Sequence, residues 1–353
     1  LPVDSTAAWV LTLRDSSSAW RSMCGTHAFL ITKFVKEWNS STRATRAHHT
    51  NCHSSGGNDM SEERLAGLRA SLDLTEVSPG LYRAPHVGEG RGVVFGGQLL
   101  GQAIVATTRT HPTKRVKSVQ TVFAKGLKVS DPVDIRVENI YEGRNIGSAR
   151  VDFIQDDRTC ATCLVLTDVA EPDLISHQVP RMPDVPTPEK IAQNLSTKAA
   201  QWVEAGPHDT LIVDDVDFLD PETVRDPRLQ LWVRFPDAPT NDATMSRALL
   251  SYATDGWLIA TSMLPHRGIG QSMAHVSIST GVLTHSLAFH NEFEAGQWIL
   301  IDHVSQFAGG GRVYGRGHVY TREGLLVSSF VQESLVRNFP TGQDPKGKES
   351  TIF

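Results

Sequence analysis

The pattern of apolar and polar positions is clearest in residues 307–337, where β-branched and aromatic residues flank a short break marked by glycine. Residues of these kinds favour strands, and glycine marks turns. The segment therefore predicts two long strands joined by a tight turn at 321–324. The rest of the chain is organised around this predicted hairpin.

The same pattern occurs earlier in the chain, because residues 307–333 of this segment align without a gap with residues 141–167. Identities are few, but the turn, glycine, arginine and apolar positions keep their register. The informative position is a difference, since Gln332 aligns with Leu166. A polar amide where the sister copy has leucine predicts two equivalent halves with one active site.

In the first half, an apolar and small-residue stretch precedes the predicted strands. No carboxylate occurs between residues 92 and 110, so the stretch predicts a helix that is buried on most sides. Gly96, Gly97 and Gly101 are expected to allow close approach of a sheet. The strands that follow are predicted at 116–124, 132–141, 146–156 and 159–166.

The second half repeats this plan with a strand at 229–236 and one helix running to residue 264, capped by Asn241 or Asp242. Further strands are predicted at 273–280, 282–291, 297–306 and 311–320, followed by the strand that holds Gln332. A long helix wrapped by strands in each half predicts an α+β fold.

The chain is expected to divide into five parts: an extension (1–59), a first unit (60–167), a proline-rich linker (168–228), a second unit with the active site (229–338) and a tail (339–353). The extension is rich in Ser, Thr, His and Asn. It is interpreted as a targeting segment or, preferably, as a disordered or non-native extension upstream of a start at Met60, which opens a capped helix.

Composition excludes several classes of protein. A net charge of −5 gives no electrostatic reason to expect nucleic acid or an anionic membrane as a partner. No apolar run approaches the roughly 20 residues of a membrane span. Four cysteines are too few for a disulfide scaffold, so a cytoplasmic protein is predicted. Exposed sheet edges favour a homo-oligomer.

The sequence gives no case for a metal or a redox cofactor. Cys160 and Cys163 form a lone CxxC within a predicted strand, where an offset of three places the side chains on opposite faces. Both are therefore predicted to be structural filler. A cluster of histidines and a cysteine in the extension lacks a second set of ligands. The cluster consists of His48, His49, Cys52 and His53.

The second half adds Asp255 and Gln332 to a plan whose first half lacks both. An Asp with its ordinary pKa of about 3.9 is ionised at neutral pH and accepts a proton from water. Backbone N–H groups near a helix start would stabilise an oxyanion. The alternative interpretation is that Asp255 only ends a helix and Gln332 is an ordinary hydrogen-bonded strand residue.

Strand alternation restricts the partners of Asp255. Gln332 is predicted to share a face with Ser328, Phe330 and Ser334, whereas Glu333 points the other way. Glu333 is therefore the weaker candidate.

Four segments together resemble the acyl-CoA thioesterase II family: VFGGQLLGQAI, SYATDGWLIATSMLPH, HSLAFH and GGGRVYGRGHVYTREGLLVSSFVQESLVR. The resemblance extends from about residue 81 to 337. It implies a double hot-dog fold, in which two long helices are each wrapped by a curved antiparallel sheet. It also implies hydrolysis of fatty acyl-CoA to free fatty acid and coenzyme A without a cofactor. The family's catalytic Asp and Gln fall on Asp255 and Gln332, which would orient the attacking water.

The family's third site residue, a Ser or Thr, does not carry over. Its position, three residues before His285, is occupied by Val282, and Thr284 replaces the Asp before that His. Thr280 and Thr284 share a face with Val282 if the strand is unbroken, so either is a candidate for the hydroxyl. Ala288 in place of the usual Trp is expected to reshape the acyl pocket.

Two alternative functions remain. The first is a hot-dog protein that binds acyl-CoA without hydrolysing it, since Val282 replaces a hydroxyl residue. The second is a hydratase or dehydratase, which needs an Asp and a His close together on one element. The helix that ends at Asp255 contains no His, which disfavours this chemistry.

Overall fold

The structure is a computed structural model of the chain and describes residues 58–87, 92–194 and 206–345. Helix α2 (Asn58–Leu72) begins just before Met60. The interpretations of the preceding extension, including its His/Cys cluster, concern residues outside the described ranges.

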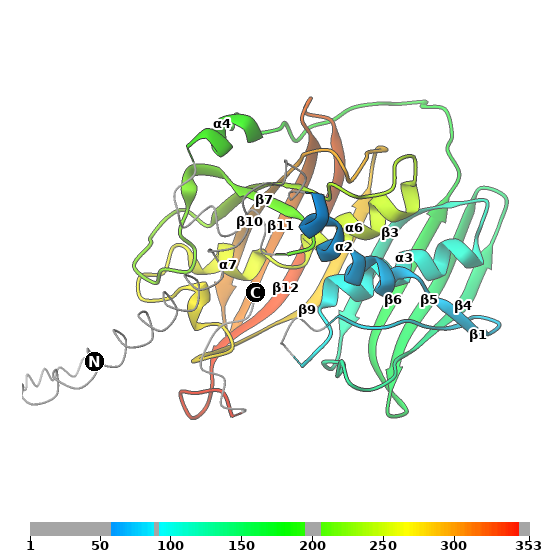
Figure 1. Ribbon diagram of the computed structural model, residues 1–353, viewed down its shortest axis with the longest axis horizontal. Coiled ribbons are helices and arrows are strands. Elements are labelled where there is room, and N and C mark those ends of the chain that lie inside the picture. The colour runs from blue at the N-terminus through cyan, green and yellow to red at the C-terminus, as the bar shows by residue number, and fades with distance from the viewer. Residues whose placement is uncertain (1–57, 88–91, 195–205, 346–353) are drawn as a thin grey trace, which may run out of the picture. The chain divides into compact units, whose positions relative to one another are not determined.

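The described strands form one twelve-stranded antiparallel sheet in the order β1-β2-β4-β5-β6-β3-β9-β12-β11-β10-β8-β7 (Figure 1). The first half contains β1 (Thr75–Ser78), β2 (Leu81–Arg83), β3 (Arg115–Phe123), β4 (Asp134–Glu142), β5 (Ile146–Gln155) and β6 (Arg158–Asp168). The second half contains β7 (Asp209–Ile212), β8 (Arg228–Arg234), β9 (Ile278–Phe289), β10 (Ile299–Gly309), β11 (Arg312–Thr321) and β12 (Leu326–Asn338). The halves meet where β3 pairs with β9.

The strand order reads the same in both directions from the β3–β9 junction, which fits the predicted repeat. β5 and β11 are both ten residues long. An irregularity between Asn139 and Tyr141 of β4 recurs between Ser305 and Phe307 of β10. The duplication therefore extends to local departures from regular pairing.

The pairing of the strands corrects the residue of the first half that corresponds to Gln332. Gly315 of β11 pairs with Gln332, whereas Ala149, its counterpart in β5, pairs with Val165. The turn between β11 and β12 is longer than the turn between β5 and β6, which shifts the register beyond it. The counterpart of Gln332 is thus Val165, which is 2% exposed, and not Leu166, which is 39% exposed.

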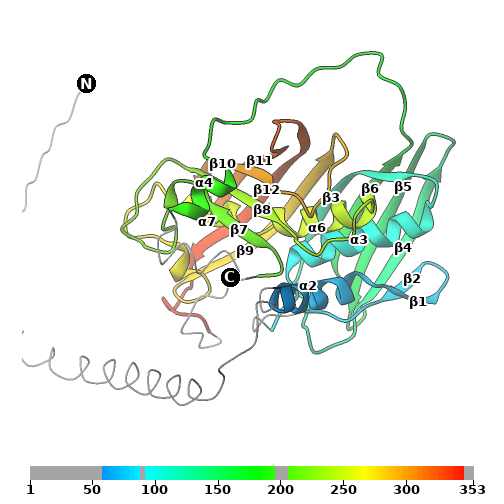
Figure 2. The same ribbon diagram turned by 45° about the horizontal axis from the view of Figure 1, so that its top comes forward.

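Helices α2, α3 (Gly96–Thr110) and α6 (Ala243–Thr254) lie on one face of the sheet (Figures 1 and 2). An added Cβ on Gly97 would lie 2.6 Å from the Tyr252 oxygen, and one on Gly101 would lie 3.2 Å from the Ala248 oxygen. Helices α3 and α6 therefore run antiparallel in close contact. Gly97 and Gly101 admit another helix, so the expectation that they admit a sheet was wrong for these two, whereas Gly96 lies against Phe123 of β3 as well as Asp255.

The second helix of the prediction is two helices, α6 and α7 (Leu258–Met263). Capping by Asp242 is confirmed, since its Oδ1 accepts a hydrogen bond of 2.8 Å from the Met245 N–H. The break follows from local chemistry. Thr254 donates its hydroxyl to the Ser251 carbonyl, 3.0 Å away, and Gly256 disfavours helix.

The strands predicted in the first half are present within a few residues, but two of those predicted in the second half are merged. Segments 273–280 and 282–291 were expected to be separate strands, and instead β9 runs continuously from the last three residues of the first segment through most of the second. The short 3₁₀ helix η2 (Gln271–Met273) precedes it.

The segment predicted as a linker, 168–228, contains structure. It holds α4 (Pro188–Gln193), the edge strand β7 and the 3₁₀ helix η1 (Val213–Asp215). Every residue of β7 is buried. Apolar side chains before β7, including Met182 and Val185, pack against the cluster that contains Leu211 and Trp232.

Cys160 and Cys163 are free thiols and lie in the same hydrophobic core. The expectation of opposite faces was wrong, because the pairing of β6 with β5 is irregular next to Cys160. Burial raises the pKa of the Cys163 thiol to about 12, so it is protonated at neutral pH. Their role as core filler is consistent with this placement.

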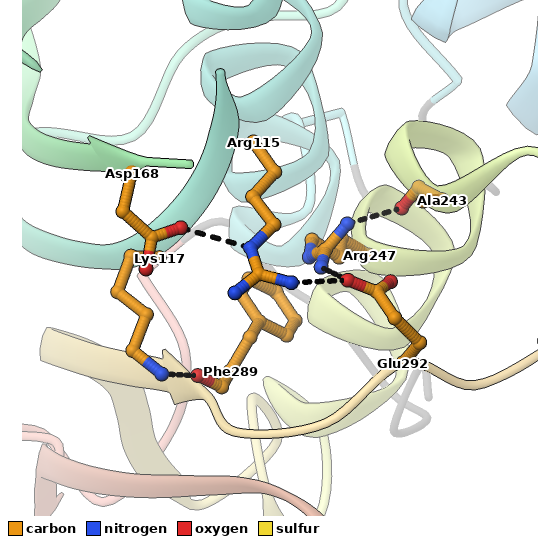
Figure 3. A network of polar contacts seen from close by, with 7 residues as sticks. All are labelled: Arg115, Lys117, Asp168, Ala243, Arg247, Phe289 and Glu292. Atoms are coloured by element: carbon orange, nitrogen blue, oxygen red, sulfur yellow. Dashed lines mark hydrogen bonds and ion pairs between the residues drawn. The ribbon is translucent and has the colours of Figure 1, made fainter. Parts of the chain in front are cut away.

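A partly buried ion network joins the two halves (Figure 3). Arg115 of β3 donates to Asp168 at 2.9 Å and to Glu292 at 2.8 Å. Glu292 also accepts a 2.7 Å hydrogen bond from Arg247 of α6, whose side chain is 5% exposed. Arg247 also donates to the Ala243 carbonyl and lies over the Phe289 ring, and Lys117 donates to the Phe289 carbonyl. These contacts fix α6 against the first half.

Candidate active site

Asp255 lies at the break between α6 and α7 and is 3% exposed. It follows the last residue of α6, where the partial negative end of the helix disfavours a carboxylate. Because α3 and α6 are antiparallel, the beginning of α3 lies beside it. Its N-cap residue, Phe95, supplies no side-chain capping bond, and its first turn has no acidic residue. The positive helix end next to Asp255 thus comes from the other half of the molecule.

Gly96 is the point of contact between Asp255 and α3. An added Cβ on Gly96 would lie 2.6 Å from Asp255 Oδ2 and 3.1 Å from Phe123 Cζ. Real Cβ atoms do not approach an oxygen so closely, so only glycine fits beside the carboxylate in this arrangement.

Replacement of Gly96 by Ala is expected to displace the Asp255 carboxylate and to lower the turnover of the chemical step about tenfold. Alanine favours helix, so the protein should still fold. Gly101→Ala is the matched control, because Gly101 lies in the same helix and faces Leu72 and Ala248. Steady-state kinetics with circular dichroism would test the prediction, and equal turnover in both variants would contradict it.

Gln332 of β12 lies beside Asp255, so the two residues singled out from the sequence are in contact. Its Nε2 donates to the Asp255 backbone oxygen at 3.2 Å and to Oδ1 at 3.4 Å. Gln332 is 1% exposed, and its Oε1 has no partner among the described residues. Ser328, Phe330 and Ser334 are buried on the same strand face, which confirms the predicted alternation, and Glu333 lies on the other face.

His285 completes the polar group around Asp255 and was used in the sequence analysis only as a landmark. It pairs with Gln332 across β9 and β12, and its Nδ1 is 3.8 Å from Asp255 Oδ1. Its Nε2 is 3.2 Å from Thr254 Oγ1, and its ring stacks on Phe330. Burial lowers the pKa of His285 to about 3, so the imidazole is neutral at pH 7.

A comparison of the two halves would have identified His285. Its counterpart is Val119, because β3 and β9 occupy equivalent places in the sheet and Val119 pairs with Val165 as His285 pairs with Gln332. The second half therefore has a His–Gln pair where the first has two valines.

A cavity of about 610 Å³ opens beside this group. Both halves and the connector contribute to its lining, which includes Phe95, Leu99, His208, Asp255, Trp257 and Thr280. The contribution of the connector was not predicted. The cavity thus combines an apolar wall with the carboxylate of Asp255.

The two candidate hydroxyls lie in different places. Thr280 lines the cavity, and its Oγ1 is 3.3 Å from His275 Nε2. Thr284 pairs with Glu333, but the next pair is Val282 with Ser334, so Leu283 forms a bulge. β9 is one unbroken strand, but the bulge interrupts its alternation, so Thr280 and Thr284 do not share a face as expected.

The bulge separates Thr284 from the site. Thr284 precedes the buried His285 and so faces the opposite side of the sheet, where its other partner, Val122, is 57% exposed. Val282 lines the cavity within an apolar cluster that includes Ile259 and thus supplies no hydroxyl. Thr280 remains the hydroxyl candidate in the cavity.

Within the described ranges, no group of three or more His, Cys, Asp or Glu side chains is arranged to hold a metal ion. None of the helices described there is long and apolar enough to cross a membrane.

Comparison with known proteins matches most of the chain to one family. Residues 84–167 match the model described as the acyl-CoA thioesterase N-terminal domain, and residues 177–336 match the acyl-CoA thioesterase C-terminal domain. Acyl-coenzyme A thioesterase 8 of Mus musculus is 27% identical over 308 residues, covering 82% of this chain and 94% of that protein. Acyl-CoA thioesterase 2 of Haemophilus influenzae is 25% identical over 284 residues, covering 77% and 98%.

Solved structures give the same result for the fold. The acyl-CoA thioesterase II TesB2 of Mycobacterium marinum superimposes with a TM-score of 0.64 at 26% identity, covering 78% of this chain and 99% of that chain. A hot-dog protein of unknown function from Alicyclobacillus acidocaldarius gives a TM-score of 0.60 at 16% identity, covering 77% and 98%. The predicted double hot-dog α+β fold is confirmed.

Proposed function

Because the chain belongs to the acyl-CoA thioesterase family and is an acyl-CoA thioester hydrolase, we propose that Asp255 and Gln332 direct water onto a fatty acyl-CoA. The observation that carries this proposal is the contact of a buried carboxylate with a buried amide beside a partly apolar cavity. The products are a free fatty acid and coenzyme A.

In the proposed reaction, Asp255 accepts a proton from water as the water oxygen attacks the thioester carbonyl carbon. The carbonyl oxygen becomes an oxyanion, which the backbone N–H groups at the beginning of α3 would stabilise. The C–S bond then breaks as the carbonyl re-forms, and coenzyme A leaves as a thiolate. The proton on Asp255 passes to that thiolate, which regenerates the carboxylate. Gln332 orients the carboxylate through its amide.

The lining of the cavity supports a fatty acyl chain as the group that is bound. Phe95, Leu99, Phe123 and Trp257 provide apolar contact surface close to Asp255. Each buried methylene group of the acyl chain contributes about 0.8 kcal/mol to binding. The apolar wall therefore favours longer acyl chains until the chain spans the cavity.

The structure supplies one observation in favour of hydratase chemistry, because His285 of β9 lies 3.8 Å from Asp255. The helix that ends at Asp255 contains no His, as expected, but a His from another element supplies the proximity. However, His285 is fully buried and is not among the residues that line the cavity. A residue without access to substrate supports a positioning role, and hydrolysis remains the better proposal.

We also propose a homo-oligomer, for which the support is the fully exposed edge strand β1. The other edge, β7, is buried, so the expectation from exposed edges applies to one side of the sheet only. A cytoplasmic location remains a prediction from the sequence, and so does the absence of nucleic acid and membrane partners.

Release of free thiol from acyl-CoAs of several chain lengths tests the proposed function. Gln332→Ala is expected to lower turnover at least tenfold, because it removes the donor that orients Asp255. Gln102→Ala is the matched control, since Gln102 is a buried glutamine of α3 that donates to the Ser71 carbonyl. Binding of a non-hydrolysable acyl-CoA thioether without thiol release at any chain length would favour the acyl-CoA-binding alternative.

A further inference from the structure

The hydrogen bonds of Thr254 determine which nitrogen of His285 carries a proton. The hydroxyl of Thr254 donates to the Ser251 carbonyl, 3.0 Å away. A hydroxyl has one proton, so Thr254 Oγ1 accepts in its second contact, which is with His285 Nε2 at 3.2 Å. The proton in this contact therefore belongs to Nε2.

The charge of His285 determines the state of its other nitrogen. The ring is 0% exposed, and burial together with the nearby His303 lowers its pKa to about 3. A neutral imidazole carries one proton, and that proton is on Nε2. Nδ1 consequently has a lone pair, and it has no hydrogen-bond partner among the described residues.

This lone pair faces Asp255, since Nδ1 and Oδ1 are 3.8 Å apart. Two acceptors in a buried site repel one another, whereas a proton on Oδ1 would be attracted to Nδ1. The ring is held in this orientation, because it stacks on Phe330 with a centroid distance of 5.3 Å and an interplanar angle of 20°. The arrangement favours the protonated form of Asp255.

We propose that His285 is a positioning residue that presents an unprotonated Nδ1 to Asp255 and thereby strengthens this carboxylate as the base that removes a proton from water. The inference rests on the proposed function of Asp255. In the reaction, the proton taken from water resides on Oδ1, where Nδ1 accepts a hydrogen bond from it, until the departing thiolate takes it. His285 itself remains neutral throughout.

The other polar groups around His285 do not offer Asp255 an unprotonated nitrogen. From β10, His303 is fully buried, and its pKa is lowered to about 4 mainly by burial, so it is neutral. From β12, Gln332 is uncharged and donates to Asp255. Among the described residues, Asp255 and His303 are thus the titratable groups that interact with His285.

The pH dependence of kcat/KM tests the proposal. A base must be deprotonated to act, so activity falls at low pH as Asp255 binds a proton. His285→Phe keeps a ring on Phe330 and removes the lone pair, so the midpoint of this acid limb should move about one pH unit lower. The same variant should lower kcat about tenfold at neutral pH with little change in KM.

His303→Phe is the matched control, because His303 is also fully buried and also packs on Phe330. It should leave the acid limb of the pH profile in place. A folded His285→Phe variant with the wild-type profile would overturn the proposal. A shift of the acid limb to higher pH would do so as well, since it would mean that Nδ1 carries a proton and donates to Asp255.

Thr254→Val provides a second test if His285→Phe does not fold. It removes the acceptor of the Nε2 proton, so the proton should move to Nδ1 and the acid limb should again move lower. Nitrogen-15 NMR of the histidines should show the Nε2-protonated form of His285 in the wild type and its loss in the variant. Thr107→Val, a buried threonine of α3, is the control. An Nδ1-protonated ring in the wild type would overturn the proposal.

Asp255→Asn separates failure of this inference from failure of the proposed function. If Asp255→Asn retains full activity, the proposed base is wrong. If Asp255→Asn abolishes activity while His285→Phe and Thr254→Val leave the pH profile unchanged, only the role of His285 is wrong.

Discussion

Replacement of Asp255 by Asn is expected to lower the turnover of acyl-CoA hydrolysis at least a hundredfold without unfolding the protein. The amide has the same shape and keeps an oxygen for the Gln332 donor, but it accepts no proton from water. General-base assistance contributes roughly 10²–10⁴ in rate, so its loss accounts for the expected effect. The folded state should tolerate the change, because a carboxylate at the end of α6 opposes the helix dipole.

Thiol release under saturating substrate, with a thermal melt of each variant, would measure this effect. Asp152→Asn is the matched control, since Asp152 is a buried carboxylate of the first half, bound to Arg150 and Thr162. It should affect stability and leave the rate constant of the folded enzyme unchanged. Near-normal turnover of Asp255→Asn would remove Asp255 from the mechanism.

Replacement of Glu292 by Ala is expected to lower the free energy of unfolding by about 3 kcal/mol, which is the lower end for breaking a buried ion pair. The side chain of Arg247 is 5% exposed, and without Glu292 the described residues offer its charge the Ala243 carbonyl and the face of Phe289 (Figure 3). Arg115 would lose one of its two carboxylate partners. The half-exposed position of Glu292 places the expected cost at the low end of that range.

Urea denaturation of a double-mutant cycle would measure this cost. Arg247→Met removes the buried charge and keeps an apolar stem of similar length, so Glu292→Ala should be much less harmful in that background. Equal costs in both backgrounds would show that Arg247 does not depend on Glu292. The cycle would thus measure how strongly this network joins α6 to the first half.

The two halves of the fold were predictable because the same order of helix and strands occurs in both, so each predicted element has a counterpart in the other half. β3, β4, β5 and β6 lie close to the predicted ranges. β9 was divided wrongly at Gly281, which lies inside the continuous strand. Its beginning was predicted too early, because the turn at His275 depends on a positive φ of 63° in a residue other than glycine. A periodic pattern contains no information about such a turn.

The sequence identified two residues that the structure brings into contact, and it missed features that depend on tertiary contact; the catalytic roles of the two residues stay predictions. Asp255 and Gln332 were identified because the first half lacks both, and they are in contact. The bulge at Leu283 depends on pairing with β12, so the change of face between Thr280 and Thr284 was not visible in the sequence. The approach of α3 to Asp255 also joins segments that are distant in the chain.

The valine pair of the first half, Val119 and Val165, has a consequence for how this molecule can evolve. Polar groups buried for catalysis commonly lower the stability of an enzyme, and in a molecule of two equivalent halves one half alone can bear that cost. At the equivalent positions the first half buries two valines, whereas the second half buries His285 and Gln332. Selection for thermal robustness and selection for rate can therefore act on different halves of one gene product.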